Sequence, residues 1–191
     1  MTISPRDLEL LNTREVRPIG WQEAKDIIES KDLARFKRSP KQLAEYLEAK
    51  EEFAITHGGM VSYLVEHRLG WKDRLQSTSG FLENPEDIRV LRNDFPYYFE
   101  RGIVHMVVWS KVRMDCDATE WPTERSCALI EAYLEKLQGR LGLKPGEYIW
   151  FKNCASLQSV PSLEHFHLLL REPYNQGLEA ERSLDVCDII S

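Results

Sequence analysis

The sequence IVHMVVW at residues 103–109 begins the stretch that decides the fold. It is a nearly continuous apolar run of strand length, rich in β-branched residues, and it predicts a strand that is covered on both faces. The same stretch, which extends from Gly102 to Arg171, contains two further strand-like runs, YIWFK at 148–152 and EHFHLLL at 164–170. Three strands close together in the sequence predict a small sheet.

A long amphipathic helix is predicted between the first two of these strands, over residues 121–141. Its apolar side chains recur three and four residues apart. They are Cys127, Ile130, Leu134, Leu137 and Leu141. Pro122 near the beginning and Gly142 after the last apolar position are typical of helix ends.

The N-terminal half predicts further helices, over residues 20–30, from Pro40 to about residue 53, and over 59–69. Ser39 is expected to cap the second of them. Residues 72–100 are rich in Asn, Pro, Gly and Ser and predict loops and turns. The fold class expected is α+β, with a helical N-terminal half and a small, mostly antiparallel sheet flanked by helices.

The length of 191 residues predicts a single domain over 1–191, because domains commonly hold roughly 100–200 residues. We expect residues 1–18 to form a flexible arm and 174–191 a surface tail. The sequence has neither an apolar run of membrane-spanning length nor a secretory signal, which predicts a cytoplasmic protein. A net charge of −6 disfavours DNA as a partner, whereas a local basic patch can still contact RNA.

The four cysteines lie at least ten residues apart, a spacing that argues against a zinc knuckle or a Cys-x-x-Cys redox site. We therefore expect reduced thiols and no metal.

Two histidines two residues apart, His165 and His167, should point to one face of the last strand. Paired imidazoles can act as base and acid, or can hold a phosphate or a metal, because histidine titrates near neutral pH. The loop that precedes them, residues 153–160, is rich in groups able to bind an oxyanion. The alternative is that both histidines are half-buried polar groups that are satisfied by their neighbours.

Asp117 and Glu120 form a second candidate site. Carboxylates three residues apart in a tight turn face the same side and can hold one cation, most naturally a guanidinium. The alternative is that they only favour the positive end of the following helix dipole.

The order of strand, helix, strand ending in Asn153, and a Gln158-Ser159-Val160 segment before the histidine strand resembles the histidine-triad superfamily of nucleotide hydrolases and transferases. In that superfamily Gln-Ser/Thr-Val precedes His-x-His-x-His. The resemblance implies a histidine-triad-like C-terminal half, with His165 at the place of the nucleophile and His167 at that of the last histidine. Leu163 stands where the first histidine would be.

A wider set of motifs spans the chain from about residue 21 to 171. The motifs are Arg38-Ser39-Pro40, Asn93-Asp94-Phe95-Pro96-Tyr97-Tyr98, residues 102–111, Trp150-Phe151-Lys152-Asn153 and residues 156–161 with the histidine strand. They resemble a fungal family long catalogued only as a domain of unknown function, some members of which are arginine-containing cyclodipeptide synthases. Those enzymes take arginine from arginyl-tRNA, condense it with a second amino acid and release a diketopiperazine. They need an Asp-x-x-Glu motif, which Asp117-Ala118-Thr119-Glu120 matches.

The resemblance implies an aminoacyl-transfer site without a cofactor, because aminoacyl-tRNA is already an activated ester. Asp117 and Glu120 would hold the guanidinium or act as base, and His165 or His167 would move the proton. The remaining candidates are Asn153, Gln158 and Ser159 as oxyanion donors, Trp150 as a further substrate contact, Arg35, Lys37, Arg38 and Lys41 as tRNA contacts, and Ser159, Ser110 or Cys154 as a covalent nucleophile. The alternatives are a histidine-triad-like nucleotide hydrolase or transferase and a noncatalytic binding module. The second amino acid and the oligomeric state stay open.

Overall fold

The computed structural model describes residues 4–13, 16–72 and 75–171. The described residues form two compact units, unit 1 with residues 4–13, 16–72 and 94–101, and unit 2 with residues 75–93 and 102–171. Helices and one antiparallel sheet confirm the α+β fold class. The single domain over 1–191 stays a prediction, and the expected tail at 174–191 lies outside the described residues.

Unit 1 is helical, as predicted. Its elements are α1 (Pro5–Leu11), α2 (Trp21–Glu29), the 3-10 turn η1 (Leu33–Arg35), α3 (Pro40–Thr56), α4 (Met60–Tyr63) and the π-helical turn η2 (Leu64–Arg68). The predicted cap of α3 is confirmed, because the Ser39 hydroxyl accepts from the Gln42 amide while the Gln42 side chain accepts from the Ser39 amide. No helix of the described residues is long and apolar enough to cross a membrane.

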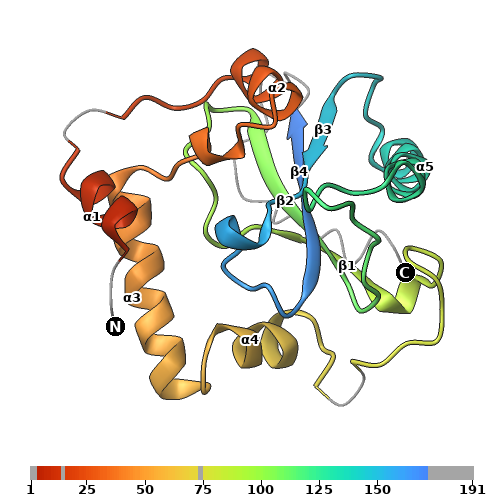
Figure 1. Ribbon diagram of the computed structural model, residues 1–191, viewed down its shortest axis with the longest axis horizontal. Helices are drawn as coiled ribbons and strands as arrows, with labels where there is room; N and C mark the ends of the chain where they lie inside the picture. The colour runs from red at the N-terminus through yellow and green to blue at the C-terminus, as the bar shows by residue number, and fades with distance from the viewer. Residues whose placement is uncertain (1–3, 14–15, 73–74, 172–191) are drawn as a thin grey trace. The chain divides into compact units, whose positions relative to one another are not determined.

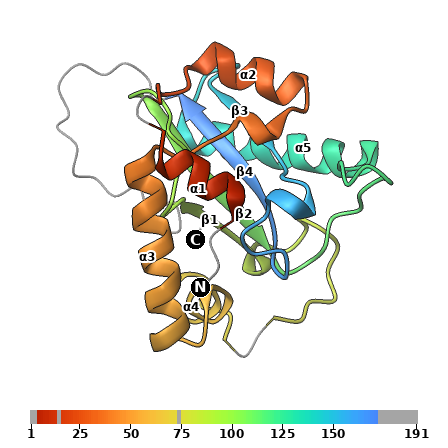
Figure 2. The same ribbon diagram turned by 60° about the vertical axis from the view of Figure 1, so that its left-hand side comes forward.

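The N-terminal arm is more ordered than the sequence suggested. It contains α1, which lies against α3 (Figures 1 and 2). Arg6 fastens it, because its Nη2 donates to the carbonyl of Ala34 at 2.7 Å. The helix begins at Pro5 with Ser4 as its N-cap, the same Ser-Pro signal that begins α3.

Within the described residues, unit 2 contains one sheet and one long helix. The strands are β1 (Ile88–Arg92), β2 (Ile103–Ser110), β3 (Tyr148–Phe151) and β4 (Glu164–Arg171), in the order β1-β2-β4-β3 with every neighbouring pair antiparallel. The helix is α5 (Glu124–Leu141), and short 3-10 turns lie at η3 (Pro85–Asp87) and η4 (Ala155–Leu157). Strands β2 and β4 are buried on both faces, as predicted for the first of them.

Strand β1 was missed in the sequence, where residues 72–100 read as loops and turns. It is only five residues long, Arg89 interrupts its apolar run and Arg92 ends it, so its local pattern is weak. Pairing with β2 makes it a strand, because Val90 lies opposite Val108 in an antiparallel ladder. A long-range contact therefore overrides a short ambiguous segment.

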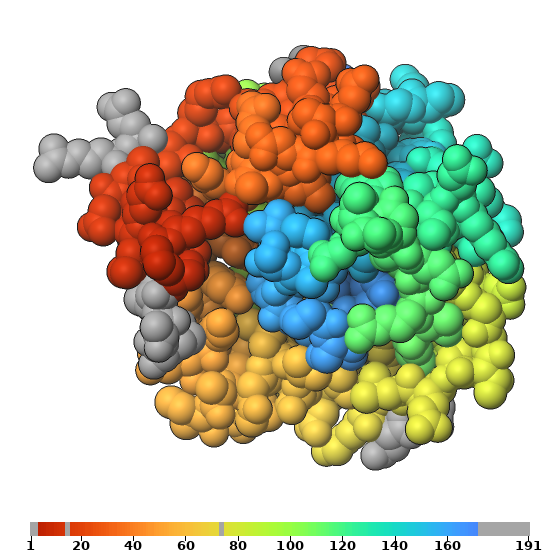
Figure 3. Space-filling view, in the orientation of Figure 1, coloured from red at the N-terminus to blue at the C-terminus, as the bar shows by residue number. Residues whose placement is uncertain are grey.

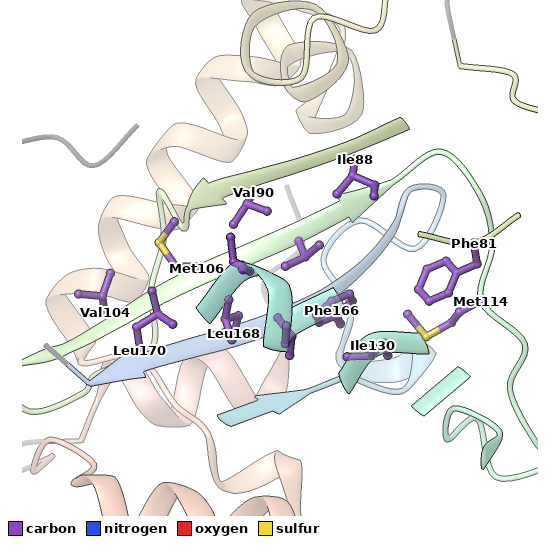
Figure 4. Packing of buried hydrophobic residues seen from close by; sticks show 13 residues of the cluster. Phe81, Ile88, Val90, Val104, Met106, Met114, Ile130, Phe166, Leu168 and Leu170 are labelled. Carbon is purple, nitrogen blue, oxygen red and sulfur yellow. The ribbon is translucent and has the colours of Figure 1, made fainter. Parts of the chain in front are cut away.

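The core of unit 2 lies between α5 and one face of the sheet (Figure 4). Alternate residues of the two central strands supply it, namely Val104, Met106 and Val108 of β2 and Phe166, Leu168 and Leu170 of β4. From α5 it receives Ile130, Leu134 and Leu137. Because side chains alternate along a strand, the remaining residues of β2 and β4 face the opposite side.

Helix α5 begins at Glu124 rather than at residue 121, because Thr123 is its N-cap and accepts from the Ser126 amide at 3.2 Å. It ends at Gly142, whose φ of +65° is left-handed, as predicted.

Replacing Gly142 with Ala should cost about 1 kcal/mol, since a Cβ meets nothing within 4 Å there and only the left-handed backbone is penalised. Gly139→Ala is the matched control, because Gly139 lies inside α5 with equally open space and should gain about 0.5–1 kcal/mol. Urea unfolding of both variants measures the difference. Equal effects of the two substitutions would contradict the assignment of the cap.

Candidate functional site

The histidines lie on the face of the sheet opposite α5. His165 and His167 of β4 share this face, as predicted, and the register places Trp109 of β2 opposite His165. His105, two strand repeats before Trp109, belongs to the same face. Three imidazoles therefore gather on adjacent strands, with ring centroids 5.5 Å apart for His165 and His167 and 5.0 Å apart for His105 and His167.

The imidazole of His165 is held as a neutral base. Its Nδ1 lies 2.8 Å from the Leu163 carbonyl, which can only accept, so Nδ1 carries a hydrogen, and in the neutral ring Nε2 carries the lone pair. Burial lowers the pKa of His165, and the hydrogen bond to Leu163 opposes this only in part. The ring packs against Trp109 with centroids 4.7 Å apart. His165 therefore has an unprotonated Nε2 that can take a proton or attack an electrophile.

The imidazole of His167 is engaged at both nitrogens. Its Nε2 lies 3.1 Å from Nδ2 of Asn153, an amide nitrogen that can only donate. Its Nδ1 therefore carries the hydrogen and donates to Nε2 of His105 at 2.9 Å. Phe151 stacks on the same ring, with centroids 4.8 Å apart. Of the two histidines predicted to move the proton, His165 has a ring nitrogen without a hydrogen bond to the described residues, whereas both ring nitrogens of His167 are engaged.

The loop after β3 is ordered by its own polar groups. Nε2 of Gln158 donates to the Asn153 carbonyl at 2.7 Å, which fixes the residue that touches His167. Two of the predicted oxyanion donors thus hold the loop in place. The third, Ser159, is exposed on the same loop.

A buried ion pair lies beside His165. Lys152 and Glu164 bond through Nζ and Oε1, and their side chains are only 8% and 4% exposed. Glu164 also accepts from the backbone amides of Met114 and His165. Since Glu164 precedes His165 on β4 and Lys152 precedes Asn153, the pair joins the two segments that carry the site.

Asp117 organises its own turn. Its Oδ1 accepts from the Thr119 amide at 2.8 Å, from the Thr119 hydroxyl at 2.6 Å and from the Trp121 amide at 3.2 Å. The Asp117 amide in turn donates to the Trp121 carbonyl. This carboxylate is exposed, and its Oδ1 shapes the backbone of the turn. Its role in holding a cation or acting as base stays a prediction.

Glu120 joins the acidic turn to the loop after β3. Its Oε2 accepts from the Ala155 amide at 2.6 Å, at the beginning of η4 and two residues after Asn153. Figure 3 shows the two segments in contact, the turn in green and the loop in blue. Glu120 has a φ of +64°, a left-handed conformation that is rare for residues other than glycine and is found more often at functional sites.

Trp150 does not share the histidine face. It pairs with Leu168 on β4 and packs on Phe166, so it lies on the side of the sheet that faces α5. Its Nε1 donates to Oε1 of Glu131 on α5 at 2.5 Å. Strand alternation therefore places Trp150 on the face opposite His165 and His167, and its role as a substrate contact stays a prediction.

The predicted tRNA contacts lie in unit 1. Arg35 pairs with Glu23 at 3.3 Å, and Lys37 is exposed. Lys41 lies 3.9 Å from Glu45. Arg38 points inward instead, as its Nε and Nη2 donate to the Phe95 carbonyl at 3.1 and 3.0 Å and its guanidinium lies over the Tyr46 ring. Burial lowers the pKa of Arg38, and its guanidinium is engaged by these groups of unit 1, whereas its role as a phosphate contact stays a prediction.

The candidate nucleophiles differ in their surroundings. Ser110 is buried, and its hydroxyl both donates to the Val112 carbonyl and accepts from the Val112 amide, so it is committed to its turn. Cys154 lies 3.2 Å from the Ser156 hydroxyl. Within residues 4–13, 16–72 and 75–171, no group of three or more His, Cys, Asp or Glu side chains is placed to hold a metal ion.

The sequence did not single out His105 as a candidate residue. The side chain is buried, and one of its hydrogen-bond partners is His167. The available signal was its spacing of four residues from Trp109, which places both side chains on one face of a strand. The sequence does not reveal that β2 lies next to β4, which brings that face to the histidines.

Comparison with known proteins places the chain among fungal relatives. It is 33% identical over 175 residues to N-acetylglucosamine-induced protein 1 of Candida albicans, covering 81% of this chain and 69% of that protein. It is 34% identical over 194 residues to the uncharacterized protein YPL067C of Saccharomyces cerevisiae, covering 96% and 95%. A crystal structure of HTC1 matches with a TM-score of 0.60 and 33% identity, covering 90% of this chain and 95% of that one. Residues 20–171 match the family described as protein of unknown function DUF3605, and the chain belongs to that family.

Proposed function

We propose that this protein is a tRNA-dependent cyclodipeptide synthase that condenses arginine from arginyl-tRNA with a second amino acid. The observation that carries the proposal is the continuous path from the acidic turn to the histidine face. Glu120 binds the Ala155 amide, and Asn153, two residues earlier, binds His167. The Asp-x-x-Glu motif and the histidines thus belong to one connected part of unit 2.

Formation of a cyclodipeptide requires a base and an ordered site, and unit 2 contains groups that can serve as both. The α-amine of one aminoacyl-tRNA attacks the ester carbonyl of the other, so that a C–N bond forms and the ester C–O bond breaks. Nε2 of His165 takes the amine proton and returns it to the departing ribose oxygen. The free amine of the resulting dipeptidyl ester then attacks its own ester carbonyl, which closes the ring and releases the second tRNA.

The substrate is already activated, so positioning and proton transfer account for the catalysis required. The oxyanion donors are backbone and side-chain groups of the loop after β3, among which Ser159 is exposed. The exposed cations Arg35, Lys37 and Lys41 of unit 1 are the groups available for tRNA phosphates.

Expression in a heterologous host, followed by mass spectrometry for cyclic dipeptides that contain arginine, tests the proposal. Asp117→Asn and Glu120→Gln each keep the oxygen that accepts the backbone hydrogen bond and remove only the charge. Either should lower the yield about tenfold or more, as charge-assisted contacts are roughly twice as strong as neutral ones. Glu124→Gln, at an exposed position in the first turn of α5, is the control and should leave the yield unchanged. Folded wild-type protein that makes no such product would overturn the proposal.

A second candidate is a nucleotide hydrolase or transferase that uses His165 as its nucleophile. The free lone pair on Nε2 of His165 favours it, because the same nitrogen could attack a phosphorus atom. Leu163, which is buried and apolar, offers no further imidazole there. Hydrolysis of adenosine phosphoramidate that disappears in His165→Ala would select this function over the synthase.

A further inference from the structure

The hydrogen on Nδ1 of His165 is held by one backbone carbonyl. Nδ1 bonds to the Leu163 carbonyl, whereas Nε2 has no hydrogen bond to the described residues. A neutral imidazole can carry its hydrogen on either nitrogen, and the bond that one nitrogen makes decides the position. The Leu163 carbonyl therefore decides which nitrogen of His165 has the lone pair.

Leu163 lies at the end of a short turn before β4. Its amide lies 3.4 Å from the Val160 carbonyl, which is long for a hydrogen bond of this kind. Val160 and Leu163 are buried, but Pro161 and Ser162 between them are exposed. The position of the Leu163 carbonyl therefore depends on what else holds the turn.

Arg113 binds this turn at two points. Its Nη1 donates to the Pro161 carbonyl at 3.1 Å, and its Nη2 donates to the Ser162 carbonyl at 3.2 Å. The Ser162 carbonyl belongs to the peptide group that leads into Leu163, so the guanidinium fixes the backbone directly before the carbonyl that binds His165. The donors of a guanidinium lie in one rigid plane, an arrangement that a flexible lysine ammonium does not reproduce.

The backbone that carries Arg113 is itself ordered on both sides. Before it, the Ser110 hydroxyl bonds to the amide and to the carbonyl of Val112. After it, the buried Met114 donates its amide to the Glu164 carboxylate. The same carboxylate lies 3.9 Å from Nη1 of Arg113. Although 65% exposed, the Arg113 side chain therefore extends from a fixed point to a fixed partner.

We propose that Arg113 is a positioning residue for His165. Arg113 clamps the turn at residues 160–163, the turn presents the Leu163 carbonyl, and that carbonyl keeps the hydrogen on Nδ1 and the lone pair on Nε2. The guanidinium acts through the backbone of the turn, to which both of its hydrogen bonds go. This role concerns the ring of His165 and applies to any reaction that uses Nε2.

The tautomer of His165 can be measured directly in the full chain. In protein labelled with ¹⁵N at histidine, a two-dimensional NMR spectrum at about pH 8, where histidine is neutral, distinguishes a ring nitrogen that carries hydrogen from one that has a lone pair. The signals of His165 are those that disappear in His165→Gln. In Arg113→Gln the Nδ1 and Nε2 signals should move toward each other, because both tautomers become populated. Arg125→Gln removes an exposed arginine from the first turn of α5 and is the control that should leave them in place.

A second variant separates the clamp from the charge. Arg113→Lys keeps a positive charge beside Glu164 but lacks the rigid pair of donors, so it should give an intermediate shift of the two signals. Wild-type signals in folded Arg113→Gln overturn the proposal. Wild-type signals in Arg113→Lys also overturn it, because the effect would then belong to the charge. Circular dichroism verifies that each variant is folded, and Arg113→Lys decides alone if Arg113→Gln is not.

The kinetic consequence rests on the proposed function. With His165 as the base, only molecules with a lone pair on Nε2 are competent, so Arg113→Gln should lower kcat about 2- to 10-fold and leave KM unchanged. A change of tautomer in a protein that makes no cyclodipeptide supports the role of Arg113 and rejects the synthase. A change of tautomer without any change in kcat supports that role and removes His165 as the base.

Discussion

His165→Ala is expected to lower the rate of cyclodipeptide formation by about 10²- to 10⁴-fold, the usual contribution of a positioned base. The reason is that His165 alone among the three clustered imidazoles has a ring nitrogen without a hydrogen bond in the described part of the chain. Rates measured with purified protein and arginyl-tRNA test this. His67→Ala, at an exposed position of unit 1, is the control and should retain the wild-type rate.

The pH dependence of the rate should also report the protonation of His165. Burial lowers the pKa of His165, so the ring is neutral at pH 7, and the rate should fall only when the pH drops below the ordinary histidine pKa of about 6.5. The unfolded chain takes up this proton at a higher pH than the folded protein, so stability should also decline as the pH falls through that window. His165→Gln should lose this part of the decline in urea unfolding. A variant with the wild-type rate and pH profile would remove His165 from the mechanism.

Lys152→Met is expected to lower the free energy of unfolding by about 3–5 kcal/mol, the usual cost of leaving one charge of a buried pair without its partner. Among the described residues, Glu164 would keep backbone amides and the largely exposed Arg113 around a carboxylate that is 4% exposed. Urea unfolding monitored by circular dichroism measures the loss.

Two further variants make the measurement specific. Arg113→Gln removes a cation 3.9 Å from the same carboxylate, but Arg113 is 65% exposed and should contribute less than about 1 kcal/mol. The double variant Lys152→Met with Glu164→Gln removes both charges and should recover part of the loss. If Lys152→Met cost no more than Arg113→Gln, the pair would not be a buried electrostatic contact.

Local periodicity predicted much of unit 2. The spacing of apolar residues located α5, and Gly142 located its end, because both signals lie within a few neighbouring residues. Strand alternation placed His165 and His167 together and Phe166 on the other side. The same rule places Trp150 on the other face from the histidines, but only once the register of β3 against β4 is known. That register depends on contacts between segments that are distant in the sequence.

The site depended on information that the sequence does not carry locally. His105 meets His167 only because β4 inserts between β2 and β3, an order that sequence position does not reveal. The sequence predicted a site at Asp117 and Glu120 from their two carboxylates alone. The geometry of this turn follows from backbone hydrogen bonds to Asp117 and from the left-handed conformation of Glu120, which no pattern of residue types specifies.

The strand order has a consequence for synthesis of the chain. Strand β4 is the last of the described strands to leave the ribosome, yet it occupies an inner place between β2 and β3. Until it arrives, a nascent chain exposes an apolar β2 with one unpaired edge, the kind of surface that draws other chains into aggregates. We therefore infer that the histidine cluster is assembled at the end of folding, in the same event that shields this edge. A ribosome stalled before residue 164 would leave a chain in which the edge of β2 is unpaired and the histidine cluster is incomplete.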